Sequence, residues 1–185
     1  MSPQLHRSVT TCANARTRRD AAARWAASAE ATAKLLVVAP SPEAGIRVLR
    51  EAIGRDRAAV FGWQRATPGE LWARLAAPAL ARRGLVQVGH VVLEALSARV
   101  VHQLRARGEL GRFQAVGDRP GLAHALAKTM SELALAEIDS DRLPQDLMRI
   151  VHAYRDELAQ QGLADRADLL RAAVETIESA REHPL

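Results

Sequence analysis

The chain has 185 residues, 48% of them apolar but only 3% aromatic, so Leu, Val and Ala must form most of any core. One cysteine, Cys12, excludes an internal disulfide and is typical of a reducing compartment. No run approaches the roughly 20 apolar residues of a membrane helix, and the N-terminal residues lack the apolar centre of a secretory signal. We therefore expect a cytoplasmic protein without membrane contact.

The net charge of +5 is distributed unevenly along the chain. Residues 1–83 contain 13 Arg and one Lys against six acids, whereas residues 84–185 contain 11 Arg and one Lys against 15 acids. The basic first part suggests a surface that meets polyanions. The alternative is a compositional bias of the genome, because 24 of the 26 basic residues are Arg.

The first part of the chain predicts a partial α/β unit. Residues 1–33 contain a weak strand signal at 8–12 and an Ala-rich helix at 16–33. Residues 35–39 (LLVVA) form an unbroken apolar run, which predicts a strand buried on both faces, as in a parallel sheet covered by helices. Ser41 then predicts an N-cap, and Pro42 the first residue of the next helix.

A second strand and helix follow. Residues 58–63 (AAVFGW) predict a short strand. Thr67 is a predicted N-cap, Pro68 the first helical residue, and Glu70 the other half of a capping box. Arg82, Arg83 and Gly84 end this helix.

From residue 91 onward the pattern predicts helices only. They cover residues 91–107, 120–135, 144–161 and 165–177, and each carries an apolar stripe at helical spacing. Residues 111–117 are predicted to be a loop. The predicted divisions are residues 1–33 as tail and helix, 34–83 as partial α/β subdomain, and 84–185 as helical subdomain.

The sequence contains no recognisable catalytic motif. The Lys128-Thr129 pair lies within a predicted helix and lacks the glycines of a phosphate loop, and no E-x-K nuclease motif is present. The six histidines form no H-x-x-x-H pair, so we expect no zinc site, even though His90 and Glu94 share a helical spacing. Helix capping accounts for the Asp165 and Asp168 pair. We expect no catalytic residue, metal or cofactor in this chain, and leave open whether it belongs to an enzyme.

The order of the segments resembles a known class. Residues 38–44 (VAPSPEA) are similar to the strand–turn–helix of superfamily 1 helicases that touches single-stranded DNA, with Ser41 at the polar position. Residues 65–71 are similar to the next T-F-H-S-L-type turn at Thr67 and Leu71, but not at its aromatic residue or histidine. Residues 154–170 fit a Y-x3-L-x3-G-L-x-D-x-x-D-L-L segment that ends a helical insertion.

More narrowly, residues 34–175 resemble the helicase-like N-terminal region of AddB-type helicase/nuclease B subunits, which are PD-(D/E)XK nuclease family proteins. Residues 1–33 do not resemble the first strand and phosphate-loop equivalent of that family. The resemblance implies a partial P-loop-helicase-like parallel sheet of few strands with a larger all-α insertion, predominantly helical overall. It also implies that the chain is a piece of a longer subunit whose nuclease domain lies further on.

The implied function is that of a non-catalytic DNA-binding scaffold in double-strand break processing and recombinational repair. Its partners would be single-stranded or duplex-end DNA and a helicase–nuclease partner subunit. The alternative is a free-standing α-helical protein-interaction module that does not bind DNA.

Five residues are candidates for DNA contact, and each has a structural alternative. Ser41 and Thr67 are helix caps whose helix N-termini also offer N–H groups to a phosphate. Trp63 is a candidate for base stacking, or a core residue. Arg47 and Arg65 are candidate phosphate partners, or ordinary solvated arginines.

Overall fold

The computed structural model describes residues 8–30, 32–54 and 60–179. The chain divides into two compact units, Met1–Leu71 (unit 1) and Trp72–Leu185 (unit 2). The sequence predicts this division later, after residue 83. Most of α3 (Pro68–Arg82) thus belongs to unit 2, and Arg83, directly after it, forms an ion pair with Glu175 of the same unit.

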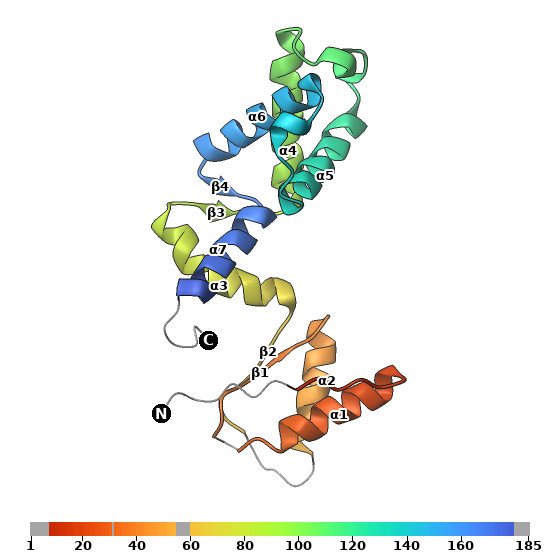
Figure 1. Ribbon diagram of the computed structural model, residues 1–185, viewed down its shortest axis with the longest axis vertical. Helices are drawn as coiled ribbons and strands as arrows, with labels where there is room; N and C mark the ends of the chain where they lie inside the picture. The colour runs from red at the N-terminus through yellow and green to blue at the C-terminus, as the bar shows by residue number, and fades with distance from the viewer. Residues whose placement is uncertain (1–7, 31, 55–59, 180–185) are drawn as a thin grey trace. The chain divides into compact units, whose positions relative to one another are not determined.

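Unit 1 contains one βαβ motif preceded by a helix (Figure 1). Its elements are α1 (Ala15–Ala27), β1 (Leu35–Val38), α2 (Pro42–Ile53) and β2 (Trp63–Ala66), followed by the start of α3. The two strands pair in parallel, with Leu35 opposite Trp63 and Val38 opposite Ala66. Helix α2 makes the crossover and packs against both strands, and α1 packs against α2.

Several predicted boundaries in unit 1 are wrong. Residues 8–12 form no strand, and α1 ends at Ala27 rather than at residue 33. The Ser28 hydroxyl donates to the Trp25 carbonyl at 2.6 Å and so satisfies one of the terminal carbonyls of α1. The second strand begins at Trp63 because Gly62, with φ +81, has a left-handed backbone that no extended strand accommodates. Residues 58–59 of the predicted strand lie outside the described residues.

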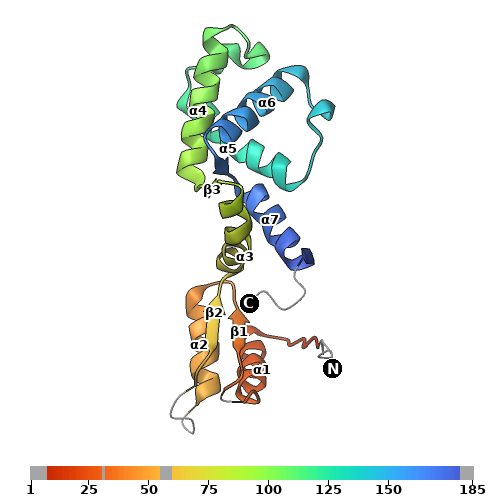
Figure 2. The same ribbon diagram turned by 90° about the vertical axis from the view of Figure 1, so that its left-hand side faces the viewer.

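The prediction that β1 is buried on both faces is also wrong. Leu35 and Val37 share the face that packs with Trp63 against a small core, whose other buried members are Ala23, Ala26 and Ala52. Val38, on the opposite face because side chains alternate along a strand, is 45% exposed. The two strands lie side by side in Figure 2. The apolar run therefore predicts the strand correctly but not its surroundings.

Unit 2 is mainly helical and includes most of α3. Its further helices and strands are β3 (Val86–Gln87), α4 (His90–Ala106), the 3-10 helix η1 (Gly111–Val116), α5 (Pro120–Leu135), the 3-10 helix η2 (Ser140–Arg142), α6 (Gln145–Gln160), β4 (Leu163–Ala164) and α7 (Arg166–Ser179). One apolar core joins α4, α5 and α6, and its most deeply buried members are Val100, Leu110 and Ile150. The predicted helices agree closely with these bounds.

Two predictions for unit 2 need correction. The chain after residue 91 is not helical throughout, because β4 pairs in parallel with β3. Two-residue strands are too short to show a periodic pattern. Residues 111–116 are a 3-10 helix rather than a loop, and the Arg112 Nε lies 2.8 Å from the Asp146 carboxylate of α6. Within the described residues, the fold is predominantly helical with two small parallel two-stranded sheets.

Candidate functional site

The carboxyl ends of β1 and β2 bring two polar turns to one edge of the unit 1 sheet. Ser41 follows β1 and Thr67 follows β2, and the strands are parallel. The Ala39 N–H donates to the Ala66 carbonyl at 3.0 Å, which joins the two turns where they leave the sheet. In open α/β sheets this edge is where ligands bind. We refer to it as the carboxyl edge.

At the first turn, Ser41 is the N-cap that the sequence predicts. Its hydroxyl accepts a hydrogen bond from the Ala44 N–H at 3.3 Å, and its backbone is extended. The pKa of Glu43 is lowered by a hydrogen bond from its own backbone N–H and then by one from the Ser41 hydroxyl; burial opposes this, and the charge of Arg65 adds a smaller lowering effect. A carboxylate thus already lies at this helix N-terminus, where a bound phosphate would have to compete with it.

At the second turn, Thr67 and Glu70 form the predicted capping box. The Thr67 hydroxyl accepts from the Glu70 N–H at 3.2 Å, and the Glu70 carboxylate accepts from the Thr67 N–H at 2.7 Å. The Arg65 guanidinium lies 3.8 Å from the same carboxylate. The hydroxyl and the backbone N–H of Thr67 therefore both take part in capping α3. Helix capping is the alternative to DNA contact that the sequence offers for this residue.

A pocket of about 560 Å³ opens at the carboxyl edge between α1 and the turn after β1. Its lining includes Ser41 and three arginines, Arg18 and Arg19 of α1 and Arg47 of α2. We call it the arginine groove. The Arg19 Nε lies 2.9 Å from the Glu51 carboxylate, and Arg18 donates to the Cys12 carbonyl at 3.4 Å. The groove therefore contains more cationic than anionic side chains, because Glu43 is the one acidic residue among the described residues that line it.

Trp63 and Arg65 occupy different environments although both belong to β2. Trp63 is half-buried and packs against the core of unit 1, as its structural alternative predicts. Arg65 lies over Gly45 of α2, where a Cβ added to the glycine would stand 3.2 Å from the Arg65 Cβ. Because Gly45 has no side chain, the aliphatic part of the Arg65 side chain can lie directly against α2. The guanidinium extends toward the carboxyl edge, where it meets Glu70.

The structure brings Ser41 and Arg47 together in the arginine groove and places Arg65 and Thr67 around the neighbouring turn. Sequence reasoning missed Arg18 and Arg19 as members of the groove. The R-T-R-R cluster at residues 16–19 is a signal for them, but nothing in the sequence shows that α1 packs beside α2.

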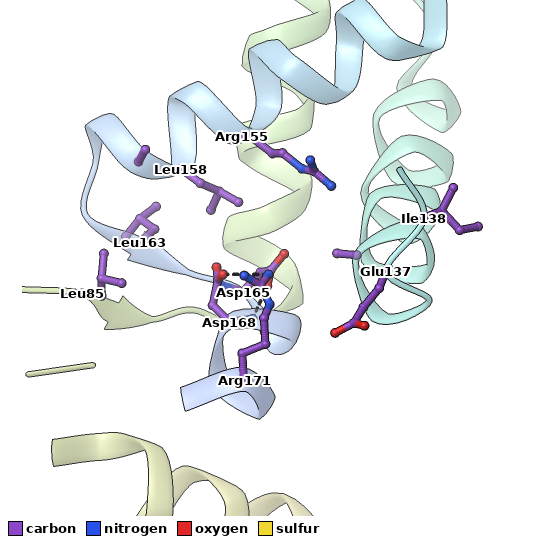
Figure 3. A pocket seen from close by; sticks show the side chains of 11 residues that line it. Leu85, Glu137, Ile138, Arg155, Leu158, Leu163, Asp165, Asp168 and Arg171 are labelled. Atoms are coloured by element: carbon purple, nitrogen blue, oxygen red, sulfur yellow. Dashed lines mark hydrogen bonds and ion pairs between the residues drawn. The ribbon is translucent and has the colours of Figure 1, made fainter. Parts of the chain in front are cut away.

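Unit 2 contains a second pocket, also of about 560 Å³, which Figure 3 shows from close by. Its charged lining consists of Arg155 of α6, Asp165 before α7, Asp168 and Arg171 of α7, and Glu137 after α5. It therefore lies beside the segment 154–170 on which the helicase resemblance partly rests.

The two aspartates of this pocket form a reciprocal helix cap, as predicted. The Asp165 Oδ1 accepts from the backbone N–H groups of Ala167 and Asp168 at 2.8 and 2.9 Å, and the Asp168 Oδ2 accepts from the Asp165 N–H at 3.1 Å. Burial, then the Asp165 charge, raises the pKa of Asp168, and Arg171, 3.0 Å away, opposes this. Burial and then the same two carboxylates raise the pKa of Tyr154, a core residue with 3% exposure.

One cluster in unit 2 has the composition of a metal site. His90 and Glu94 of α4 and His124 of α5 place one ligand atom each within 4.8 Å of one another. The sequence shows the His90–Glu94 spacing but not its proximity to His124, which lies one helix further along the chain. The expectation that the chain holds no metal therefore stays a prediction.

Comparison of the chain with protein-family models and with curated protein sequences found no match. No described helix combines the length and the apolar character that crossing a membrane requires.

Proposed function

We propose that unit 1 binds nucleic acid at the carboxyl edge, as a non-catalytic DNA-binding part of an AddB-like helicase–nuclease that acts in double-strand break processing. The observation that carries the proposal is the arginine groove at this edge, which Arg18, Arg19 and Arg47 line. Single-stranded or duplex-end DNA is the ligand, and a helicase–nuclease subunit is the protein partner.

The distribution of charge supports a polyanionic ligand. Residues 1–71 contain ten Arg and one Lys against six acids, which gives +5, whereas residues 72–185 contain 14 Arg and one Lys against 15 acids, which gives zero. All of the net positive charge thus belongs to unit 1. Arginine is spread almost evenly, with ten in the 71 residues of unit 1 and 14 in the 114 residues of unit 2, so the difference arises because unit 1 contains fewer acids.

The geometry supports guanidinium groups, rather than the helix N-termini, as the proposed phosphate ligands. Glu43 and Glu70 already lie at the N-termini of α2 and α3, so these helix ends are poorer anion sites than uncovered ones. Phosphate binding therefore falls mainly to guanidinium groups, with Arg47 in the groove and Arg65 at the neighbouring turn. Ser41 and Thr67 fix the two turns, and Trp63 supports the strand beneath them rather than stacking a base.

The test is fluorescence anisotropy of the full chain with a labelled single-stranded oligonucleotide between 50 and 200 mM salt. Each phosphate neutralised contributes about −0.7 to the slope of log affinity against log salt, so three contacts weaken binding roughly 18-fold over this range. Arg47→Ala and Arg65→Ala should each lower the slope by about 0.7. Arg107→Ala, which removes an exposed arginine of unit 2, is the matched control and should leave it unchanged.

Two results would contradict the proposal. Equal effects of Arg107→Ala and Arg47→Ala would show that binding follows total charge rather than the arginine groove. No binding at 50 mM salt would favour the alternative of a protein-interaction module.

A further inference from the structure

The surface of unit 2 carries two imidazoles and one carboxylate that come from neighbouring helices. His90 and Glu94 are four residues apart on α4 and so share a face. His124 comes from α5, which packs along α4. The three residues are the His–Glu–His cluster, and they belong to the lining of neither the arginine groove nor the pocket around Asp165.

The distances within the His–Glu–His cluster are close to those of a metal site. The Glu94 Oε2 lies 3.2 Å from the His124 Nδ1 and 3.6 Å from the His90 Nε2. Tetrahedral zinc, with bonds of about 2.0–2.1 Å, holds its ligand atoms roughly 3.3 Å apart. The two imidazole rings stand edge to face with 5.4 Å between their centroids, and the three ligand atoms all lie within 4.8 Å of one another.

The three side chains of the cluster are at least partly exposed. Those of His90, Glu94 and His124 are 57%, 40% and 59% exposed. Their exposure leaves them room to rotate about their own side-chain bonds. Two imidazoles and a carboxylate are a ligand set that suits zinc and the neighbouring divalent transition metals, and it leaves one tetrahedral position to water.

The surrounding charges set the strength of binding. His90 is the first residue of α4, where the partial positive charge of the helix N-terminus opposes a cation. The Glu94 carboxylate offsets that effect. Lys128, one turn after His124, lies 3.9 Å from the Glu132 carboxylate, so its ammonium group is partly neutralised by an acid outside the cluster. These opposing charges and the exposure of the cluster indicate micromolar rather than nanomolar affinity.

We propose that the His–Glu–His cluster binds Zn²⁺, or a similar late first-row divalent cation, and so links α4 to α5. The metal replaces the hydrogen bond between Glu94 and His124 with coordination bonds to both helices. Because the three ligands span the α4–α5 contact, binding stabilises the folded form of unit 2.

The experiment is calorimetric titration of Zn²⁺ into the full chain with Cys12→Ser as background, which removes the thiol as a competing ligand. We expect one saturable site with a micromolar Kd. His124→Ala and His90→Ala should each raise the Kd at least tenfold, and Glu94→Gln severalfold. His102→Ala is the matched control, because it removes another exposed histidine of α4, and its Kd should equal that of the background protein.

Two further measurements distinguish coordination from loose association. Co²⁺ in place of Zn²⁺ should give the strong visible absorption of a tetrahedral site, and His124→Ala should abolish it. Saturating Zn²⁺ should raise the Tm of unit 2 by roughly 5 °C in the background protein and leave that of His124→Ala unchanged. The exchanged histidines are exposed and Glu94 is partly exposed, so the apo variants should melt close to the background protein.

Three outcomes would overturn the proposal. The first is the absence of saturable binding at Zn²⁺ concentrations up to about 100 μM, which is roughly 100 times the expected Kd. The second is an unchanged Kd in His124→Ala, and the third is a loss of affinity in His102→Ala as large as that in His124→Ala. In each case the Glu94–His124 hydrogen bond is the whole role of the cluster.

Discussion

The reciprocal cap at the start of α7 predicts a large and specific loss of stability in Asp165→Ala. The Asp165 carboxylate belongs to a residue that is 6% exposed and accepts two backbone N–H groups, at 2.8 and 2.9 Å. Removing an N-cap costs typically about 1 kcal/mol and up to about 2. The N–H of Ala167, a residue with 5% exposure, would also lose its partner away from water, which costs about 1–3 kcal/mol. We therefore expect a destabilisation of about 2–3 kcal/mol.

The amide of Asp165→Asn keeps an oxygen acceptor in the same place, so this variant should lose less than about 1 kcal/mol. Asp139→Ala is the matched control. The Asp139 side chain caps η2 with one hydrogen bond of 3.2 Å at an exposed position, and its removal should cost about 0.5 kcal/mol or less.

The assay is urea unfolding of the full chain, followed by circular dichroism, with hydrogen exchange of the α7 amides. With a slope of about 1–3 kcal/mol per molar urea, Asp165→Ala should lower the midpoint of the unit 2 transition by about 0.7–3 M. The α7 amides should exchange correspondingly faster. An unchanged midpoint would refute the capping argument. A loss in Asp165→Asn as large as in Asp165→Ala would show that the charge matters, not the hydrogen bonds.

The raised pKa of Asp168 predicts a pH-dependent effect of Asp168→Asn. Folding favours the protonated acid, so its stabilisation is fully present below the unfolded pKa, near 3.8, and is lost as the pH rises through the folded pKa. Asparagine does not ionise, so the stability of the variant relative to the wild type should rise from about pH 3.5 to about pH 7 in parallel urea titrations; a fall would contradict the assignment. Gly111→Ala should destabilise unit 2 by about 1–3 kcal/mol, because φ is +57 there and the added Cβ would lie 2.7 Å from the Asp146 Cβ. Gly121→Ala, at a helical position with open space, is its control in thermal unfolding, and equal Tm values for the two variants would refute the steric argument.

Local signals in the sequence determined most of the helices and their starts. Ser41, Thr67 with Glu70, and Asp165 with Asp168 all cap helices as their spacing predicts, because a cap depends on residues within one turn of each other. The apolar stripes located α4 to α7 for the same reason. The crossover from β1 through α2 to β2 also followed from the order of these signals.

Contacts between distant residues decided what the local signals left open. The two-residue strands β3 and β4 pair although Val86 and Leu163 lie far apart in the sequence, and they carry no periodic pattern of their own. The apolar run of β1 did not show that Val38 would be exposed, because burial depends on which elements cover the sheet.

The same distinction holds for the candidate sites. The sequence offered Ser41, Arg47 and Arg65 as candidates, but only the packing of α1 against α2 placed Arg18 and Arg19 in the arginine groove. The spacing of His90 and Glu94 was visible in the sequence, whereas the third ligand depends on the packing of α5 along α4. A helix repeats its contacts every three or four residues and so shows them in sequence, but a contact between two helices is set by tertiary packing.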